Sequence, residues 1–171
     1  MKSETQPIGR IAIAPASSVP VNVSQRILPV AVWTVRIALA AAFASAVADR
    51  FGLWGPPGAA GVAWGNLERF NAYVATLNWF LPRNLIPIVG WMATITEISL
   101  AAALLVGWQL RWVALFSAVL LLLFGLTMTI ALGPKTPLDY SVFSAASAAF
   151  LLFATQPAGN ARSMPITHER R

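Results

Sequence analysis

Four long apolar runs constrain the fold of this chain more than any other feature. They cover about residues 27–48, 85–108, 112–132 and 140–154. The first three match the roughly 20 residues that cross a bilayer as a helix. The fourth is shorter and suits a span that tilts or leans on its neighbours. Because backbone groups in hydrocarbon must find partners within the chain, each run is expected to be an α-helix.

The composition excludes an ordinary soluble enzyme. Only 11% of the residues are charged and 57% are hydrophobic, whereas soluble domains carry about 25% charged residues. The net charge of +6 therefore indicates basic loops beside membrane spans, and not a nucleic-acid partner. The chain has no cysteine and one histidine, His168. We therefore predict no metal site and no intrinsic cofactor.

Short connections predict an all-α, up-down four-helix bundle. Residues 109–111 join the second run to the third, and residues 133–137 join the third to the fourth. Both pairs must therefore be antiparallel. The transmembrane domain is expected to cover residues 27–155, with a mobile polar tail at 1–26 and a second polar tail at 156–171. A signal peptide is rejected, because the apolar stretch 11–14 is too short.

Basic residues indicate the orientation of the bundle. One side carries seven of them and the other side four, and the richer side is expected to be cytoplasmic. The seven are Lys2, Arg10, Arg26, Arg111, Arg162, Arg170 and Arg171; the four are Arg50, Arg69, Arg83 and Lys135. We therefore predict a multi-pass protein of the bacterial inner membrane with both termini in the cytoplasm.

The connection over residues 49–84 contains a further predicted helix, at about 66–81. Apolar residues recur there at helical spacing, at Leu67, Phe70, Val74, Leu77 and Leu81, and Asn66 can cap its start. One interpretation is an amphipathic helix lying in the outer headgroup layer. The other is a helix packed over the mouth of the bundle, and the two are compatible.

Arg36 and Glu97 are the strongest candidates for a functional site. Each lies near the middle of an apolar run, where a charge costs about 2.5–3.5 kcal/mol on insertion scales. The two helices place these charges at similar depth, so an ion pair is expected. Trp33 and Thr94 lie one turn away along their helices. The pair either fixes the register of two helices or forms the polar anchor of a ligand cavity or a proton-handling site.

A second candidate cluster lies at the outer face. Asp49 and Arg50 end the first run, and Lys135, Asp139 and Tyr140 bracket the start of the fourth. These residues either form a ring of salt bridges over the bundle mouth or are solvated interface charges of little energetic weight. Tyr140 either belongs to an aromatic belt or donates its hydroxyl into the cavity.

The order of these motifs resembles the DoxX family of four-span bacterial membrane proteins. The resemblance covers about residues 27–155 and rests on Arg36, residues 48–52, Glu97, residues 104–107 with Arg111, and residues 137–141. It implies an integral inner-membrane protein linked to a quinone-dependent oxidoreductase. Arg36 and Glu97, with Trp33 and Thr94, would then contact a quinone.

Three functions are compatible with the sequence. The first is a non-metal subunit of a quinone-linked membrane oxidoreductase, which needs a bound quinone or a partner subunit to carry electrons. The second is a structural or assembly subunit of a larger membrane complex. The third is a small lipid-binding or solute-binding membrane protein, although broken helices typical of transporters are not evident. The expected partners are the lipid bilayer and other membrane or oxidoreductase subunits, with no nucleic acid.

Overall fold

A computed structural model describes residues 22–157 of the chain, and both predicted tails lie largely outside this range. The described part is helical and contains no strand. Its elements in order are α1 (Asn22–Arg50), α2 (Leu67–Leu77), the 3₁₀ turn η1 (Arg83–Leu85), α3 (Ile86–Val106), α4 (Leu110–Leu132), α5 (Lys135–Asp139) and α6 (Val142–Thr155). The first helix therefore begins at Asn22, inside the segment predicted to be a tail.

Three helices are long and apolar enough to cross a membrane: α1, α3 with its preceding turn, and α4. The fourth predicted span is the shorter apolar helix α6, which has 14 residues. Large apolar side chains on these helices face outward, and Ile37, Phe116 and Leu151 are all more than half exposed. Exposure of so large an apolar surface to water is unfavourable, whereas lipid solvates it.

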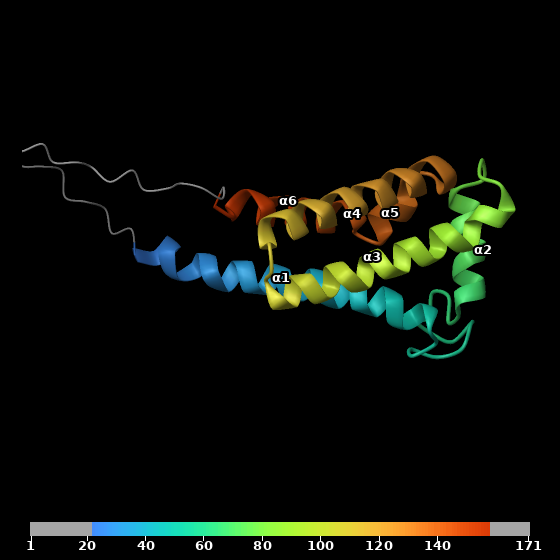
Figure 1. The fold of residues 1–171 in the computed structure, drawn as a ribbon, viewed down its shortest axis with the longest axis horizontal. Coiled ribbons are helices and arrows are strands. Elements are labelled where there is room, and N and C mark those ends of the chain that lie inside the picture. Colours follow the sequence, from blue (N-terminus) through green and yellow to red (C-terminus); the bar gives the residue numbers. More distant parts are fainter. Residues whose placement is uncertain (1–21, 158–171) are drawn as a thin grey trace, which may run out of the picture.

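The helices pack mainly as two pairs, α1 with α3 and α4 with α6, and these elements run along the long axis of the molecule (Figure 1). Small residues on α4 and α6 allow the closest approach. Ala114 and Ala149 are fully buried, and Gly125 leaves room for the ring of Phe143. Such residues let helices pack through van der Waals contact alone, which is the main attraction available in lipid.

Helix α2 lies at one end of the bundle, across the start of α3 (Figure 1). Phe70 and Val74 on α2 are buried and form a cluster with Ile86 of α3. Asn66 caps the helix as predicted, because its side chain accepts the N–H of Arg69 at 2.8 Å. The helix ends at Leu77, earlier than the predicted 66–81, because Asn78 leaves the helical conformation and begins a turn over residues 78–80. Its apolar residues face α3, which agrees with the packed interpretation.

Helix α1 is displaced along the bundle axis relative to α3. Arg36 contacts the last turn of α3 at Leu104, and the ring of Phe51, just after α1, contacts Trp91 near the start of α3. The turns of α1 before Arg36 therefore run past the α3–α4 turn, as Figure 1 shows. This offset decides which charges meet.

Candidate functional site

Glu97 is paired with Arg50 of α1. The predicted pair of Glu97 with Arg36 is wrong. An Arg50 Nη2 donates to Glu97 Oε1 at 2.8 Å, and Nη1 donates to the hydroxyl of Thr94 at 2.9 Å. Thr94 in turn donates to the carbonyl of Gly90. The side chains of Arg50 and Glu97 are each only 2% exposed. The three residues form one buried polar network near the middle of α3.

Aromatic rings enclose the charged end of Arg50. Its guanidinium carbon lies 3.8 Å from the centre of the Phe70 ring and 5.4 Å from that of Trp64. A ring face attracts a cation most when water is excluded. Helix α2 supplies Phe70 and the preceding loop supplies Trp64, so these contacts attach the connection between α1 and α2 to the network.

Two atoms of the network have no protein partner. They are Arg50 Nε and Glu97 Oε2, and both are buried. The contact between the two residues is therefore a single hydrogen bond, where Arg and carboxylate could make two. A buried group without a partner costs about 1–3 kcal/mol or more if charged. The network thus has capacity for one further donor and one further acceptor.

A third buried atom without a conventional partner is Asn71 Oδ1 on α2. It lies 2.2 Å from the position that a Cβ on Gly90 would occupy, so it faces the Cα–H of Gly90. Contacts of the Cα–H···O kind recur where helices approach closely. Glycine at position 90 therefore permits the close packing of α2 on α3.

Asp49, next to Arg50, binds the backbone of the loop. Its Oδ2 accepts the N–H groups of Ala63 and Trp64, and Oδ1 accepts that of Gly65. Charge-assisted bonds of this kind are about twice as strong as neutral ones. These adjacent residues of α1 therefore bind different partners: Asp49 binds the loop, and Arg50 binds α3.

Arg36 caps the C-terminal end of α3. Its Nε donates to the carbonyl of Leu104 at 2.8 Å and its Nη2 to that of Leu105 at 3.0 Å, and its guanidinium stacks 3.9 Å above the ring of Trp33. The last carbonyls of a helix lack partners and carry partial negative charge. Because α1 is offset along α3, Arg36 lies at the end of α3 and not at the depth of Glu97, where we predicted it.

The predicted outer cluster of five residues is not a single site. Lys135 and Asp139 pair with each other across one turn of α5, and both side chains are largely exposed. Tyr140 is also exposed, whereas Asp49 and Arg50 are buried. The structure shows no ring of salt bridges among these five residues, because Arg50 binds α3 and Asp49 binds the loop, while Lys135 and Asp139 stay on the surface.

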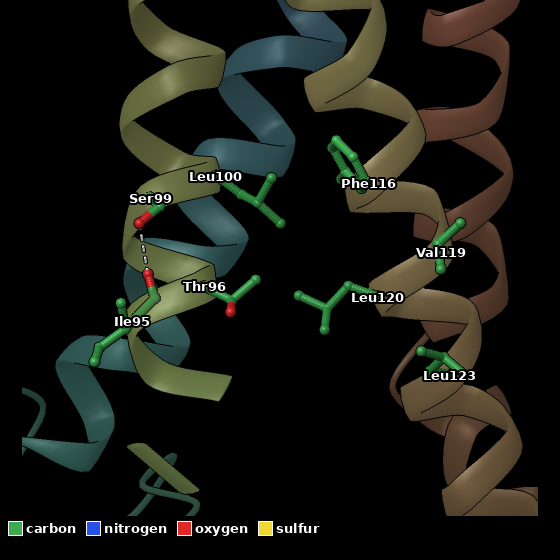
Figure 2. Close-up of a pocket in the computed structure, with 8 residues that line it drawn as sticks. All are labelled: Ile95, Thr96, Ser99, Leu100, Phe116, Val119, Leu120 and Leu123. Carbon is green, nitrogen blue, oxygen red and sulfur yellow. Dashed lines mark hydrogen bonds between the residues drawn. The ribbon is translucent and has the colours of Figure 1, made fainter. Parts of the chain in front are cut away.

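A groove of about 420 Å³ separates α3 from α4 (Figure 2). Its walls are mostly apolar, with two hydroxyl residues on α3, and the Ser99 hydroxyl donates to the carbonyl of Ile95. None of the charged residues of the network lines it; the lining residues are Ile95, Thr96, Ser99, Leu100, Phe116, Val119, Leu120 and Leu123. The groove and the polar network are therefore separate features.

Within residues 22–157, no group of three His, Cys, Asp or Glu side chains is arranged to hold a metal ion. Sequence reasoning identified Glu97 and Thr94 but did not assign Arg50 and Asp49 to the bundle interior. The signal that could have found them is their position at the end of an apolar run, followed by glycines and by Trp64 and Phe70. Aromatic side chains close to a basic residue can shelter its charge.

Within residues 22–157, these features define a helical integral membrane protein in which a buried ion pair lies beside the α1–α2 connection. The sequence model of the methylamine utilisation protein MauE family matches residues 28–139, which is more than half of the chain. The protein therefore belongs to the MauE family. This match corrects the resemblance to DoxX, which rested on short apolar motifs common to many membrane helices.

No curated protein and no solved structure matches the chain significantly. The match to the family covers α3 and α4 entirely and α1 from residue 28 onward. It includes Arg36, Asp49, Arg50, Thr94 and Glu97.

Proposed function

We propose that the protein is a non-metal membrane subunit of an oxidoreductase-related system that serves methylamine utilisation. The observation that carries the proposal is the match to the MauE family across the three long helices and the buried network. Its role would be to hold or assemble other subunits. The described residues offer no metal-binding group and the chain has no cysteine, so an electron carrier would come from another subunit or a bound molecule.

The buried network supports a structural role in such an assembly. Asp49, Arg50 and Glu97 join α1, α3 and the α1–α2 connection through bonds of about 3 Å. They would hold the end of the bundle in one conformation. A docking surface that is already ordered loses less conformational entropy when a partner binds.

The proposed setting is the bacterial inner membrane, with both termini in the cytoplasm and α6 completing a fourth span. The predicted excess of basic residues on one side supports this orientation. A reporter that is active only in the cytoplasm, fused after residue 171, should be active. Activity of a periplasm-specific reporter at the same position would show that the orientation is the opposite one.

A gene deletion in the source organism tests the proposed function. We expect loss of growth on methylamine, normal growth on ammonium, and rescue by the wild-type gene. Native purification in mild detergent, followed by mass spectrometry, should recover further membrane or oxidoreductase subunits. Normal growth of the deletion strain on methylamine would reject the proposal.

A bound quinone remains a second proposal. It was suggested by the DoxX resemblance, and the support that is left is the apolar groove between α3 and α4, whose volume of about 420 Å³ is within the range of small-molecule sites. The same mass spectrometry tests it. Near-stoichiometric quinone would support the proposal, and its absence from the native complex would remove it.

A further inference from the structure

We propose that the two arms of the α1–α2 loop, which covers residues Phe51–Asn66, lie within the lipid leaflet at the α2 end of the bundle. Lipid, and not water, would cover its exposed apolar side chains. The proposal concerns the surface around the buried network and is independent of the role in methylamine utilisation.

The depth of the loop is the first argument. Helix α1 ends at Arg50, and the ring centroid of Phe51 lies 6.3 Å from that of Trp91, the sixth residue of α3. At 1.5 Å per residue, Trp91 lies about 7.5 Å inside the first residue of α3. The candidate span that includes α3 starts earlier still, at Arg83. The chain therefore leaves the α1 helix at a depth where α3 is still within its span.

The exposed side chains of the loop are the second argument. Phe51, Leu53 and Trp54 are 51%, 77% and 61% exposed. The indole N–H of Trp54 donates to the carbonyl of Ser45 at 3.1 Å, so the ring folds back along α1. This apolar patch is continuous with the exposed face of a membrane span, and the lipid that covers α1 therefore extends over the loop.

Backbone hydrogen bonding is the third argument. Irregular backbone at membrane depth requires partners within the protein. Nine N–H groups of the loop have an acceptor in the chain; they belong to Phe51, Gly52, Leu53, Gly55, Ala59, Val62, Ala63, Trp64 and Gly65. The carboxylate of Asp49 takes three of them, and Pro56 and Pro57 have no N–H. Asp49 thus lowers the cost of embedding the second arm of the loop, because it accepts three of its N–H groups.

The tip of the loop differs from its two arms. A Cβ on Gly58 or on Gly61 would meet no atom within 4 Å, and Ala60 between them is exposed. We infer that the arms lie in lipid and that the tip, around residues 58–61, reaches the headgroups and water.

Because the native chain has no cysteine, single cysteines can test the proposal directly. Leu53→Cys is compared with Met92→Cys, which is 63% exposed on α3 beside Trp91, with Thr76→Cys on the exposed face of α2, and with Ala60→Cys at the tip. The full-length protein in lipid nanodiscs, with both membrane faces open, is treated with a membrane-impermeant maleimide. Labelling after denaturation in SDS confirms that each thiol is intact.

We expect Leu53→Cys and Met92→Cys to react at least about tenfold more slowly than Thr76→Cys and Ala60→Cys, because the reactive thiolate is disfavoured in lipid. Reaction of Leu53→Cys as fast as Thr76→Cys, with Met92→Cys protected, would overturn the proposal.

A fluorescence measurement avoids any dependence on labelling. The emission of Trp54 is obtained as the difference between wild type and Trp54→Phe. Quenching of this emission by brominated phosphatidylcholine supports a loop in lipid. Quenching by aqueous iodide, without quenching by the brominated lipid, would place the loop in water.

Discussion

Arg50 and Glu97 are expected to be compatible with a stable fold only when both are present or both are replaced. Loss of one partner would leave a buried charge uncompensated, which costs about 3–5 kcal/mol, whereas replacement of both by apolar residues is often neutral or stabilising. We therefore expect Glu97→Gln and Arg50→Met to lower the unfolding temperature strongly, and the double variant Arg50→Met/Glu97→Leu to recover it. Thermal unfolding in detergent, followed by tryptophan fluorescence, measures this.

The double variant also separates the two interpretations of the network. If a stable Arg50→Met/Glu97→Leu protein rescues growth of the deletion strain on methylamine, the pair is structural. If it is stable but does not rescue, the charges themselves act in function. An unstable double variant would show that the polar network contributes more than mutual neutralisation.

Asp49 should be far more sensitive to substitution than the exposed Asp139. Asp49→Asn keeps the size of the side chain but loses the charge that three N–H groups share. Since a hydrogen bond to a charged group contributes about 1.5–3 kcal/mol, we expect a clear fall in the unfolding temperature. Asp139→Asn, in a surface pair, should change it little. Equal effects at both positions would contradict the role given to Asp49.

Gly107 combines a left-handed backbone with close contact to Arg36. Its φ is +79°, and an added Cβ would meet Arg36 Nη2 at 2.6 Å. Gly61 has the same φ of +79° with nothing within 4 Å, so Gly61→Ala gives the backbone strain of a positive φ, about 1–2 kcal/mol. We expect Gly107→Ala to be more destabilising than Gly61→Ala, and the difference in the free energy of unfolding measures the displacement of Arg36.

At the level of the elements, the apolar runs predicted α3 and α4 to within about two residues, because their ends coincide with glycines and turns. Pairing of side chains could not be predicted in the same way. Arg36 and Arg50 are both arginines on α1, and the offset of α1 against α3 decides which one reaches Glu97. The contacts of Phe51 with Trp91 and of Arg36 with the end of α3 mark this offset, which composition does not encode.

Two errors in the predicted elements have a common physical cause. The predicted fourth span begins at Tyr140, but α5 ends at Asp139 and α6 starts only at Val142, after Ser141 takes a left-handed conformation with φ +54°. Likewise, α1 begins before its apolar run does. In both places the hydropathy of the side chains and the helical state of the backbone change at different residues.

The environment of α2 can be followed through the ionisation of Tyr73. Burial, with a further contribution from nearby Tyr140, raises the pKa of Tyr73 above its ordinary value of 10.0. The folded state thus binds a proton more tightly than the unfolded state, so stability conferred by neutral Tyr73 should fall as the pH rises above about 10.

The chain has only two tyrosines, so the absorbance of tyrosinate, measured against pH, can follow the ionisation of Tyr73. In a Tyr140→Phe variant, the remaining transition should belong to Tyr73 and lie above the titration of free tyrosine, though less so than in wild type. A transition at the ordinary pKa would show that α2 does not shield Tyr73.

For the whole molecule, the membrane class was predictable from the sequence because it depends on summed composition, which tolerates local errors. The family was not, since short apolar motifs recur among unrelated spans. The sequence predicted contact of α1 with α3 and of α4 with α6, but not that these two contacts would be far more extensive than that of α3 with α4. Ala114, Ala149 and Gly125 bring α4 and α6 close together, while Phe116 and Leu120 face Leu100 across the groove (Figure 2).

The ion pair also constrains how the chain is made. When α1 leaves the ribosome, Arg36 and Arg50 have no acceptor, since the carbonyls of Leu104 and Leu105 and the carboxylate of Glu97 are synthesised later. An unpartnered arginine within the hydrocarbon is costly, up to about 2.5–3.5 kcal/mol at the centre of a bilayer on insertion scales. Helix α1 is therefore poorly suited to enter lipid alone, and the order of biosynthesis favours its release from the insertion machinery together with α3.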